Sequence, residues 1–143
     1  MAQVLVGKPV VRGSAEGPAL VSREPLSFWG GVDPDSGEVI DRRHDCSGAI
    51  ITGKVFVLPC GKGSSTASRT LLETIRSGTA PAAIINLEVD PILALGSILG
   101  GEFYHKTVPI VVLSEGDFAS VAEEDWLSIE ADGTVRRVAK DKA

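Results

Sequence analysis

Short apolar runs separated by glycine- and proline-rich turns recur along the chain and predict a series of buried strands. The clearest run, residues 55–58, precedes a Gly-Lys-Gly turn at residues 61–63. The next segment carries apolar residues at helical spacing, namely Ala67, Leu71, Leu72 and Ile75. Gly78 is placed to end this helix in the left-handed conformation. The pattern therefore predicts a strand, a tight turn and a helix.

A second strand and helix follow directly. Residues 82–87 are almost continuously apolar, which is typical of a strand covered on both faces. Strand, helix and strand then form a parallel crossover, which is right-handed by default. Asp90 and Pro91 predict a helix start, with Asp as the N-cap and Pro at the first helical position. The expected inner face of this helix consists of Ile92, Leu95, Ile98 and Leu99. The glycine pair at residues 100–101 is expected to end it.

Both ends of the chain add strands to this core. Short extended segments are predicted at residues 4–6, 9–11 and 19–21. Residues 109–113 predict a third buried strand, and a short helix is expected within residues 117–125. Residues 126–130 and 134–138 alternate in polarity around Ala-Asp-Gly, a hairpin signature. The predicted fold class is mixed α/β, with central parallel crossovers and additional strands at both ends.

Residues 23–48 are expected to form a long ordered loop. The stretch lacks sustained periodicity, and its prolines, glycines and aspartates supply turn chemistry. Residues 26–29 are apolar where a solvated linker would be polar, so the loop is expected to pack on its own core or on a partner. Trp29 could lie either in the core or at an interface with a partner, and the sequence leaves both roles open. Residues 139–143 are expected to be a flexible, solvated tail.

Composition fits one domain and argues against several classes of partner. The chain has 143 residues, 43% hydrophobic and 23% charged, so residues 1–143 are expected to form a single domain. A net charge of -5 without a basic run argues against nucleic-acid binding. No apolar run approaches the ~20 residues of a membrane span. The N-terminus lacks signal-peptide features, so a cytoplasmic protein is expected.

The two cysteines, Cys46 and Cys60, are too few for a disulfide scaffold, and their separation fits no metal-ligand spacing. A cytosolic chain keeps such thiols reduced, and a free cysteine behaves as a small hydrophobe. Inert thiols are therefore expected, with no metal bound by this chain alone.

The glycine turn at residues 61–63 is the strongest candidate for chemistry. A helix N-terminus after a glycine turn presents backbone N–H groups and the positive end of a helix dipole to an anion. The hydroxyl residues 64–66 would then bind carboxylate or phosphate. The turn is not a P-loop, because Gly63 separates Lys62 from the serines. It is not a dinucleotide fingerprint either, because Thr66 stands where Gly or Ala is required. A simple capped helix remains an alternative.

His44 is a second candidate, because a hydrolase triad can be drawn with Asp41 or Asp45 and Ser64. The nucleophile-elbow motif is absent from the sequence around Ser64, however. An ordinary loop histidine is therefore the expected role.

Several ordered motifs, taken together, point to a known family. They are Gly17-Pro18-Ala19-Leu20-Val21-Ser22, Pro25-Leu26-Ser27-Phe28-Trp29-Gly30-Gly31-Val32-Asp33-Pro34, Gly61-Lys62-Gly63-Ser64-Ser65-Thr66 and Ala80-Pro81-Ala82-Ala83-Ile84-Ile85. The match extends through Asp90-Pro91-Ile92 to about Val112. In these motifs the chain resembles the small subunit of the aconitase X family. The resemblance implies a swivelling β/α domain, like the mobile fourth domain of aconitase, docked on a large subunit.

The resemblance also implies a hydro-lyase. Bacterial members of the family dehydrate cis-3-hydroxy-L-proline to Δ1-pyrroline-2-carboxylate, and archaeal members dehydrate (R)-5-phosphomevalonate. Hydroxyproline is favoured here, because archaeal relatives tend to have a shorter Gly-Ser-Thr version of the loop. The large subunit of such enzymes carries the cysteines for iron or an iron–sulfur centre. The family's proposed proton acceptor is the serine directly after the glycine turn, which is Ser64. The expected substrate-binding residues are Lys62, Gly63, Ser65 and Thr66.

An alcohol is a poor base, and each unit by which its pKa falls requires about 1.4 kcal/mol. A helix N-terminus supplies only about 0.3–2 kcal/mol. Ser64 is therefore expected to act only after docking, when cations of the large subunit and exclusion of water complete the site. A metal on the large subunit would remove the substrate hydroxyl as a Lewis acid. The non-enzymatic alternative is a stand-alone regulatory module that binds small anions with the same loop.

Overall fold

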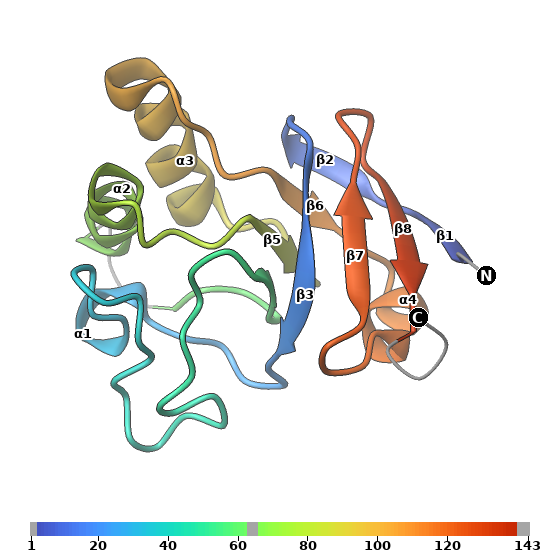
Figure 1. Cartoon of the computed structure of the whole chain (residues 1–143), viewed down its shortest axis with the longest axis horizontal. Coiled ribbons are helices and arrows are strands. Elements are labelled where there is room, and N and C mark those ends of the chain that lie inside the picture. The colour runs from blue at the N-terminus through green and yellow to red at the C-terminus, as the bar shows by residue number, and fades with distance from the viewer. Residues whose placement is uncertain (1–2, 63–65, 140–143) are drawn as a thin grey trace.

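The computed structural model describes residues 3–62 and 66–139, and within them one eight-stranded sheet carries the helices (Figure 1). The strands are β1 (Gln3–Val6), β2 (Lys8–Val11), β3 (Ala15–Val21), β4 (Val55–Val57), β5 (Ala83–Asn86), β6 (Ile110–Val112), β7 (Trp126–Ile129) and β8 (Thr134–Val138). The helices are α1 (Phe28–Gly31), α2 (Thr66–Ser77), α3 (Pro91–Tyr104) and α4 (Glu115–Ser120). Predictions for residues 63–65 and 140–143 lie outside the described residues.

The sheet is nearly closed on itself. Its strand order is β1-β8-β7-β3-β4-β5-β6-β2, so the two edge strands are β1 and β2, which only Gly7 separates along the chain. The Gly7 N–H donates to the Gly133 carbonyl at 3.1 Å. A Cβ at Gly133 would lie 2.4 Å from the Gly7 oxygen, so this close approach requires glycine. The two edge strands therefore meet at Gly7, which packs against the glycine of the turn between β7 and β8.

Parallel crossovers form the centre of the sheet, as predicted. Strands β3, β4, β5 and β6 run parallel to one another, with α2 between β4 and β5 and α3 between β5 and β6. The predicted hairpin is present as the antiparallel pair β7 and β8, and β1 adds to β8. The expectation of extra strands at both ends is confirmed.

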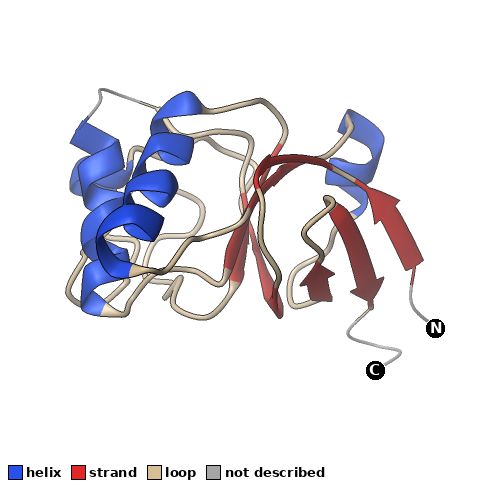
Figure 2. Ribbon diagram, turned by 90° about the horizontal axis from the view of Figure 1, so that it is seen from above, coloured by secondary structure: helices blue, strands red, loops and turns tan. Residues whose placement is uncertain are grey.

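Alternate side chains of the central strands enter two different cores. Val55 and Val57 belong to a cluster inside the curved sheet, whereas Phe56 belongs to a cluster between the sheet and helices α2 and α3. Figure 2 shows these two helices on one side of the sheet and α4 at the other end. Because both faces are covered, the central strands are apolar at nearly every position.

The helix after the glycine turn matches its prediction. It begins at Thr66, and its buried residues include Ala67, Leu71 and Ile75. Gly78 follows with a φ of 77°, the left-handed value that the sequence predicts for its end. No helix among the described residues is both long enough and apolar enough to span a membrane.

The prediction for α3 is wrong on its end and on most of its inner face, although Ile92 does pack against the core. The helix passes the glycine pair at residues 100–101 and ends at Tyr104, followed by its C-cap His105, whose φ is 56°. Leu95 and Ile98, which were expected to face inward, are 46% and 50% exposed. The fully buried side is instead made mostly of small residues, namely Leu93, Ala94, Gly96, Ser97 and Gly100.

Close packing against α2 explains this reversal. A Cβ at Gly96 would lie 2.6 Å from the Ser68 carbonyl oxygen of α2, and one at Gly100 would lie 2.6 Å from Ile75 Cδ1. On the same side, Ser97 Oγ donates to the Val108 carbonyl at 2.6 Å. The two helices can approach this closely only through the small residues of α3, so most of its large side chains point outward.

The segment between β3 and β4 contributes to the core. Leu26 and Phe28 are fully buried, whereas Trp29 is 63% exposed. The single turn α1 leaves helical geometry at Trp29 and Gly30, where φ reaches 77°. Apolar packing of this loop on its own core is therefore confirmed, but Trp29 is not part of that core.

The short helix α4 begins and ends earlier than predicted. Ser114 caps it, because its hydroxyl accepts the Asp117 N–H at 3.3 Å. Val121 returns to extended backbone and ends the helix.

Candidate functional site

The glycine turn joins β4 to α2 at the carboxyl edge of the parallel strands. Ligands of open α/β sheets bind outside this edge. The predicted site residues Gly63, Ser64 and Ser65 lie outside the described residues. The structure places their two neighbours: Lys62 follows β4 and Thr66 is the first residue of α2. The frame of the site is therefore described, although its centre is not.

One buried carboxylate fixes the turn from one side. Asp90 is only 8% exposed, and its Oδ2 accepts the Gly61 N–H at 2.6 Å. Its Oδ1 accepts the N–H groups of Ile92 at 3.0 Å and Leu93 at 3.2 Å, so the same side chain caps α3. A Cβ at Gly61 would lie 2.7 Å from Oδ2, which explains why glycine stands there.

The N-cap role of Asp90 follows from local sequence, whereas its contact with the turn does not. Gly61 and Asp90 follow β4 and β5, which are adjacent parallel strands, so their carboxyl ends lie side by side. The order of the strands in the sheet is therefore the signal that could have revealed the contact between Asp90 and Gly61. Neither the glycine turn nor the Asp90-Pro91 helix start contains that information.

The long loop fixes the turn from the other side. Leu26 forms a parallel bridge with Gly61. The Leu26 N–H donates to the Cys60 carbonyl at 3.3 Å, and the Lys62 N–H donates to the Leu26 carbonyl at 3.1 Å. Since Leu26 is itself fully buried, the first two residues of the turn, Gly61 and Lys62, are anchored to the core.

An open groove of about 560 Å³ borders the start of α2. Its lining includes Thr66, the exposed Trp29 and three charged residues, Asp33, Arg69 and Glu73. Glu73 is paired with Arg76 of the same helix through a hydrogen bond of 2.7 Å from Nε. Arg69 is the cation among these lining residues, and it lies on α2 beside the positive end of the helix dipole. The charged lining of the groove therefore consists of one cation and two carboxylates, with the cation near the start of α2.

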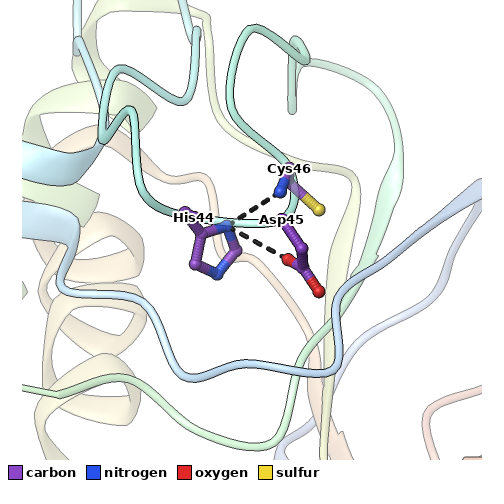
Figure 3. Close-up of side chains that lie close together, drawn as sticks. All are labelled: His44, Asp45 and Cys46. Carbon is purple, nitrogen blue, oxygen red and sulfur yellow. Dashed lines mark hydrogen bonds and ion pairs between the residues drawn. The ribbon is translucent and has the colours of Figure 1, made fainter.

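His44 does contact a serine and an aspartate, but the serine is Ser22 (Figure 3 shows His44, Asp45 and Cys46). His44 Nδ1 accepts the Cys46 N–H at 3.1 Å, and Nε2 lies 3.2 Å from the Glu24 carbonyl, so the ring proton belongs on Nε2. The Ser22 hydroxyl donates to Asp45 Oδ1 at 2.7 Å. Ser22 is fully buried, so no substrate reaches it. The cluster ties the loop to the end of β3 and is not a hydrolase triad.

The same cluster does not fit a metal centre. Potential ligand atoms of His44, Asp45 and Cys46 lie within 4.8 Å of one another. Burial and the nearby Asp45 carboxylate, however, raise the pKa of the Cys46 thiol to about 12. Burial and the carboxylates of Glu88 and Asp90 also raise the pKa of Cys60. Both ring nitrogens of His44 are already engaged in hydrogen bonds, and the Cys46 thiol donates to the Val21 carbonyl, so this arrangement offers neither a free imidazole nitrogen nor a free thiolate.

The chain is similar to proteins of known activity. It is 47% identical over 132 residues, 92% of its length, to cis-3-hydroxy-L-proline dehydratase from Pseudomonas aeruginosa, but spans only 22% of that protein. It is 44% identical over 86% of its length to the phosphomevalonate dehydratase small subunit from Methanothermobacter thermautotrophicus, and spans 88% of that subunit.

A solved structure and a family model agree with these relatives. The crystal structure of aconitase X (holo-form) from Thermococcus kodakaraensis superposes with a TM-score of 0.85 at 38% identity, over 95% of this chain and 98% of that one. The family model described as "Aconitase X swivel domain" matches residues 4–137. The chain therefore belongs to the aconitase X swivel domain family.

Proposed function

We propose that this chain is the swivelling small subunit of a cytoplasmic aconitase-X-type hydro-lyase, and that its glycine turn completes a site shared with a large subunit. The observation that carries the proposal is the turn itself, which is anchored by Asp90 and Leu26 at the start of α2 in a chain whose relatives are named dehydratases. The partner is inferred because relatives of similar length are called small subunits, while the Pseudomonas protein is much longer.

Ser64 is the proposed base. It would take the proton from the carbon next to the substrate carboxylate, while Lys62 and backbone N–H groups near residues 63–66 hold the anionic group. The helix dipole at Thr66 lowers the pKa of an alcohol only slightly, because it supplies about 0.3–2 kcal/mol. Cations of the large subunit and exclusion of water must supply the rest. The base is therefore active only in the closed assembly.

Departure of the substrate hydroxyl is assigned to groups outside this chain. Cys46 and Cys60 have raised pKa values, and His44 is committed to hydrogen bonds within the loop. An iron or iron–sulfur centre, which such enzymes hold on their large subunit, remains part of the proposal for that subunit. The contribution of this chain is limited to the proton acceptor and the anion-binding groups.

The preferred substrate is cis-3-hydroxy-L-proline, with (R)-5-phosphomevalonate as the second candidate. Both are 3-hydroxy carboxylates, so the same proton is removed next to the carboxylate. The 47% identity to a hydroxyproline dehydratase supports the first, and the match to 88% of a phosphomevalonate dehydratase small subunit supports the second. Both substrates therefore belong in one assay.

The test is to co-express the chain with an aconitase X large subunit from the same genome and to assay both dehydrations. The Ser64→Ala variant is expected to assemble normally and to lose at least about a hundredfold in kcat, as removal of a general base does. Ser65→Ala is the matched control and is expected to lose less. Near-normal turnover of Ser64→Ala would remove Ser64 from catalysis. A monomeric chain that binds small carboxylates without any large subunit would instead support the stand-alone anion-binding module.

A further inference from the structure

Helix α3 is apolar around its whole circumference. Glu102 is the only charged residue among the 14 residues of this helix. In globular proteins a helix of this kind is buried on all sides. Here the small face of α3 is buried against α2, but the opposite face is not. The exposed face is therefore as apolar as a buried helix face, but no described part of this chain covers it.

The residues of that outer face form an apolar ridge at helical spacing. The ridge consists of Leu95, Ile98, Leu99 and Phe103, and it begins at Ile92, which is itself partly buried against the core. Leu95, Ile98 and Phe103 are 46%, 50% and 64% exposed. Scattered exposed apolar side chains are ordinary on a protein surface, but a contiguous row on one helix marks an interaction site.

The ridge begins beside the glycine turn. Asp90, directly before α3, accepts the Gly61 N–H, and Ile92 lines a small cavity together with Gly61 and Lys62. Both α2 and α3 start at the carboxyl edge of the sheet, so α3 runs away from the proposed site, and Figure 1 shows this helix at the outside of the molecule. A partner that closes over the turn would thus meet the first turn of the ridge.

We infer that the apolar ridge of α3 is the docking surface for the large subunit of the dehydratase. This inference rests on the proposed function and adds the location of the interface. Two observations favour this occupant over a second copy of the chain. The ridge is continuous with the turn that the large subunit is proposed to cover. In the Pseudomonas relative the matching region is only 22% of the protein, so the remainder is available to cover the same face.

The test measures the affinity of the isolated small subunit for purified large subunit by calorimetry. The ridge variant Leu95→Asp/Ile98→Asp places two charges in the proposed interface and is expected to weaken binding at least about a hundredfold. The matched control is Val4→Asp/Val6→Asp on β1, where the two valines are 51% and 80% exposed. The control should stay within about twofold of the unmodified affinity, because β1 lies at the opposite end of the molecule (Figure 1).

Each outcome has a defined meaning. Weaker binding by the ridge variant alone, with unchanged circular dichroism and melting temperature, supports the docking surface. Should the aspartates impair folding, Leu95→Ala/Ile98→Ala serves instead, with an expected loss of about tenfold. The inference is overturned if the ridge variant binds the large subunit as tightly as the unmodified chain does, or if only the control variant loses affinity. Either result leaves the proposed function intact.

Two further outcomes separate the partners. If the unmodified chain binds no large subunit, the proposed function itself fails, and the docking surface fails with it. If light scattering shows a dimer of this chain that the ridge variant disrupts while large-subunit affinity is unchanged, a second copy is the occupant and the inference is wrong.

Discussion

Asp90 shows how one side chain can connect a local motif to a distant one. Its two carboxylate oxygens are both used, Oδ1 on the first turn of α3 and Oδ2 on Gly61. Because the residue is nearly buried, each of these N–H groups would otherwise lack a partner inside the protein. The geometry of the glycine turn therefore depends on a residue that belongs to the next crossover.

Substitutions at Asp90 should separate its two roles. Asp90→Ala loses the cap, worth about 1 kcal/mol, and leaves the Gly61 N–H unpaired, which costs a further 1–3 kcal/mol or so. Asp90→Ser can keep the cap but offers only one oxygen, so an intermediate loss is expected. Urea unfolding of the isolated chain measures both. If Asp90→Ser were as stable as the unmodified chain, the bond to Gly61 would contribute nothing.

Cys46 predicts a decline of stability at alkaline pH. Burial and the Asp45 carboxylate raise the pKa of its thiol to about 12 in the folded chain, whereas an unfolded cysteine titrates near about 8.5. The unfolded state therefore loses its proton first, and the stabilisation is complete below the unfolded pKa. It is lost as pH rises towards about 12, with a slope approaching about 1.4 kcal/mol per pH unit.

The measurement compares urea unfolding at pH 7, 9 and 10 for the unmodified chain and for Cys46→Ala. Other groups titrate in both proteins, so only the difference between the two curves reports on Cys46. That difference should shrink as pH rises, because Cys46→Ala has no thiol to ionise. Parallel curves would mean that the thiol is not shielded in the folded chain.

At the scale of elements, the contact between α2 and α3 is set by glycine. A Cβ at Gly96 would lie 2.6 Å from a backbone oxygen of α2, an atom that cannot move aside as a flexible side chain can. Gly96→Ala is therefore expected to destabilise the chain by about 1–3 kcal/mol, even though alanine favours helix by about 1 kcal/mol. Chemical denaturation tests this.

Gly116 of α4 provides the matched control. A Cβ there would meet no atom within 4 Å, so Gly116→Ala should stabilise the chain by about 0.4–1 kcal/mol. Stabilisation by both substitutions would show that α2 and α3 are not closely packed at Gly96.

The two long helices also show what a sequence pattern can and cannot predict. In α2 the apolar positions are few and regularly spaced, so the buried face follows from periodicity alone. In α3 nearly every position is apolar, so periodicity carries no information about which face is inside. Small residues form the face of α3 that packs on α2. Leu95 and Ile98, which were predicted to face the core, are exposed instead.

The candidate site also combines features that local sequence predicts with contacts that it does not predict. Strand, glycine turn, helix start and the Asp90 cap are local features, and the sequence predicts each of them. Other contacts join residues far apart along the chain. Asp90 and Leu26 anchor the start of the glycine turn, and His44 forms a hydrogen bond with Ser22. These contacts exist only because the strand order brings the segments together, so motif spacing could not reveal them.

The whole molecule has two unlike ends. Helices α2 and α3 occupy one end, while the hairpin of β7 and β8 and the strand β1 form the other (Figure 1). The groove beside Thr66 belongs to the first end, because α2 contributes to its lining. A swivelling subunit must present the first end to its partner and leave the second free to move. The proposed function therefore requires a definite orientation of this chain in the assembly.

The two tryptophans report on that orientation, because Trp29 lines the groove beside Thr66 and Trp126 lies on β7. They are 63% and 43% exposed. In a chain labelled with 5-fluorotryptophan, unlabelled large subunit should shift the fluorine resonance of Trp29 and remove its sensitivity to heavy water, because docking excludes solvent from the groove. The resonance of Trp126 should stay unchanged, and Trp126→Phe assigns the two signals. Movement of the Trp126 signal alone would place the large subunit at the wrong end, where no group of this chain could reach a shared substrate.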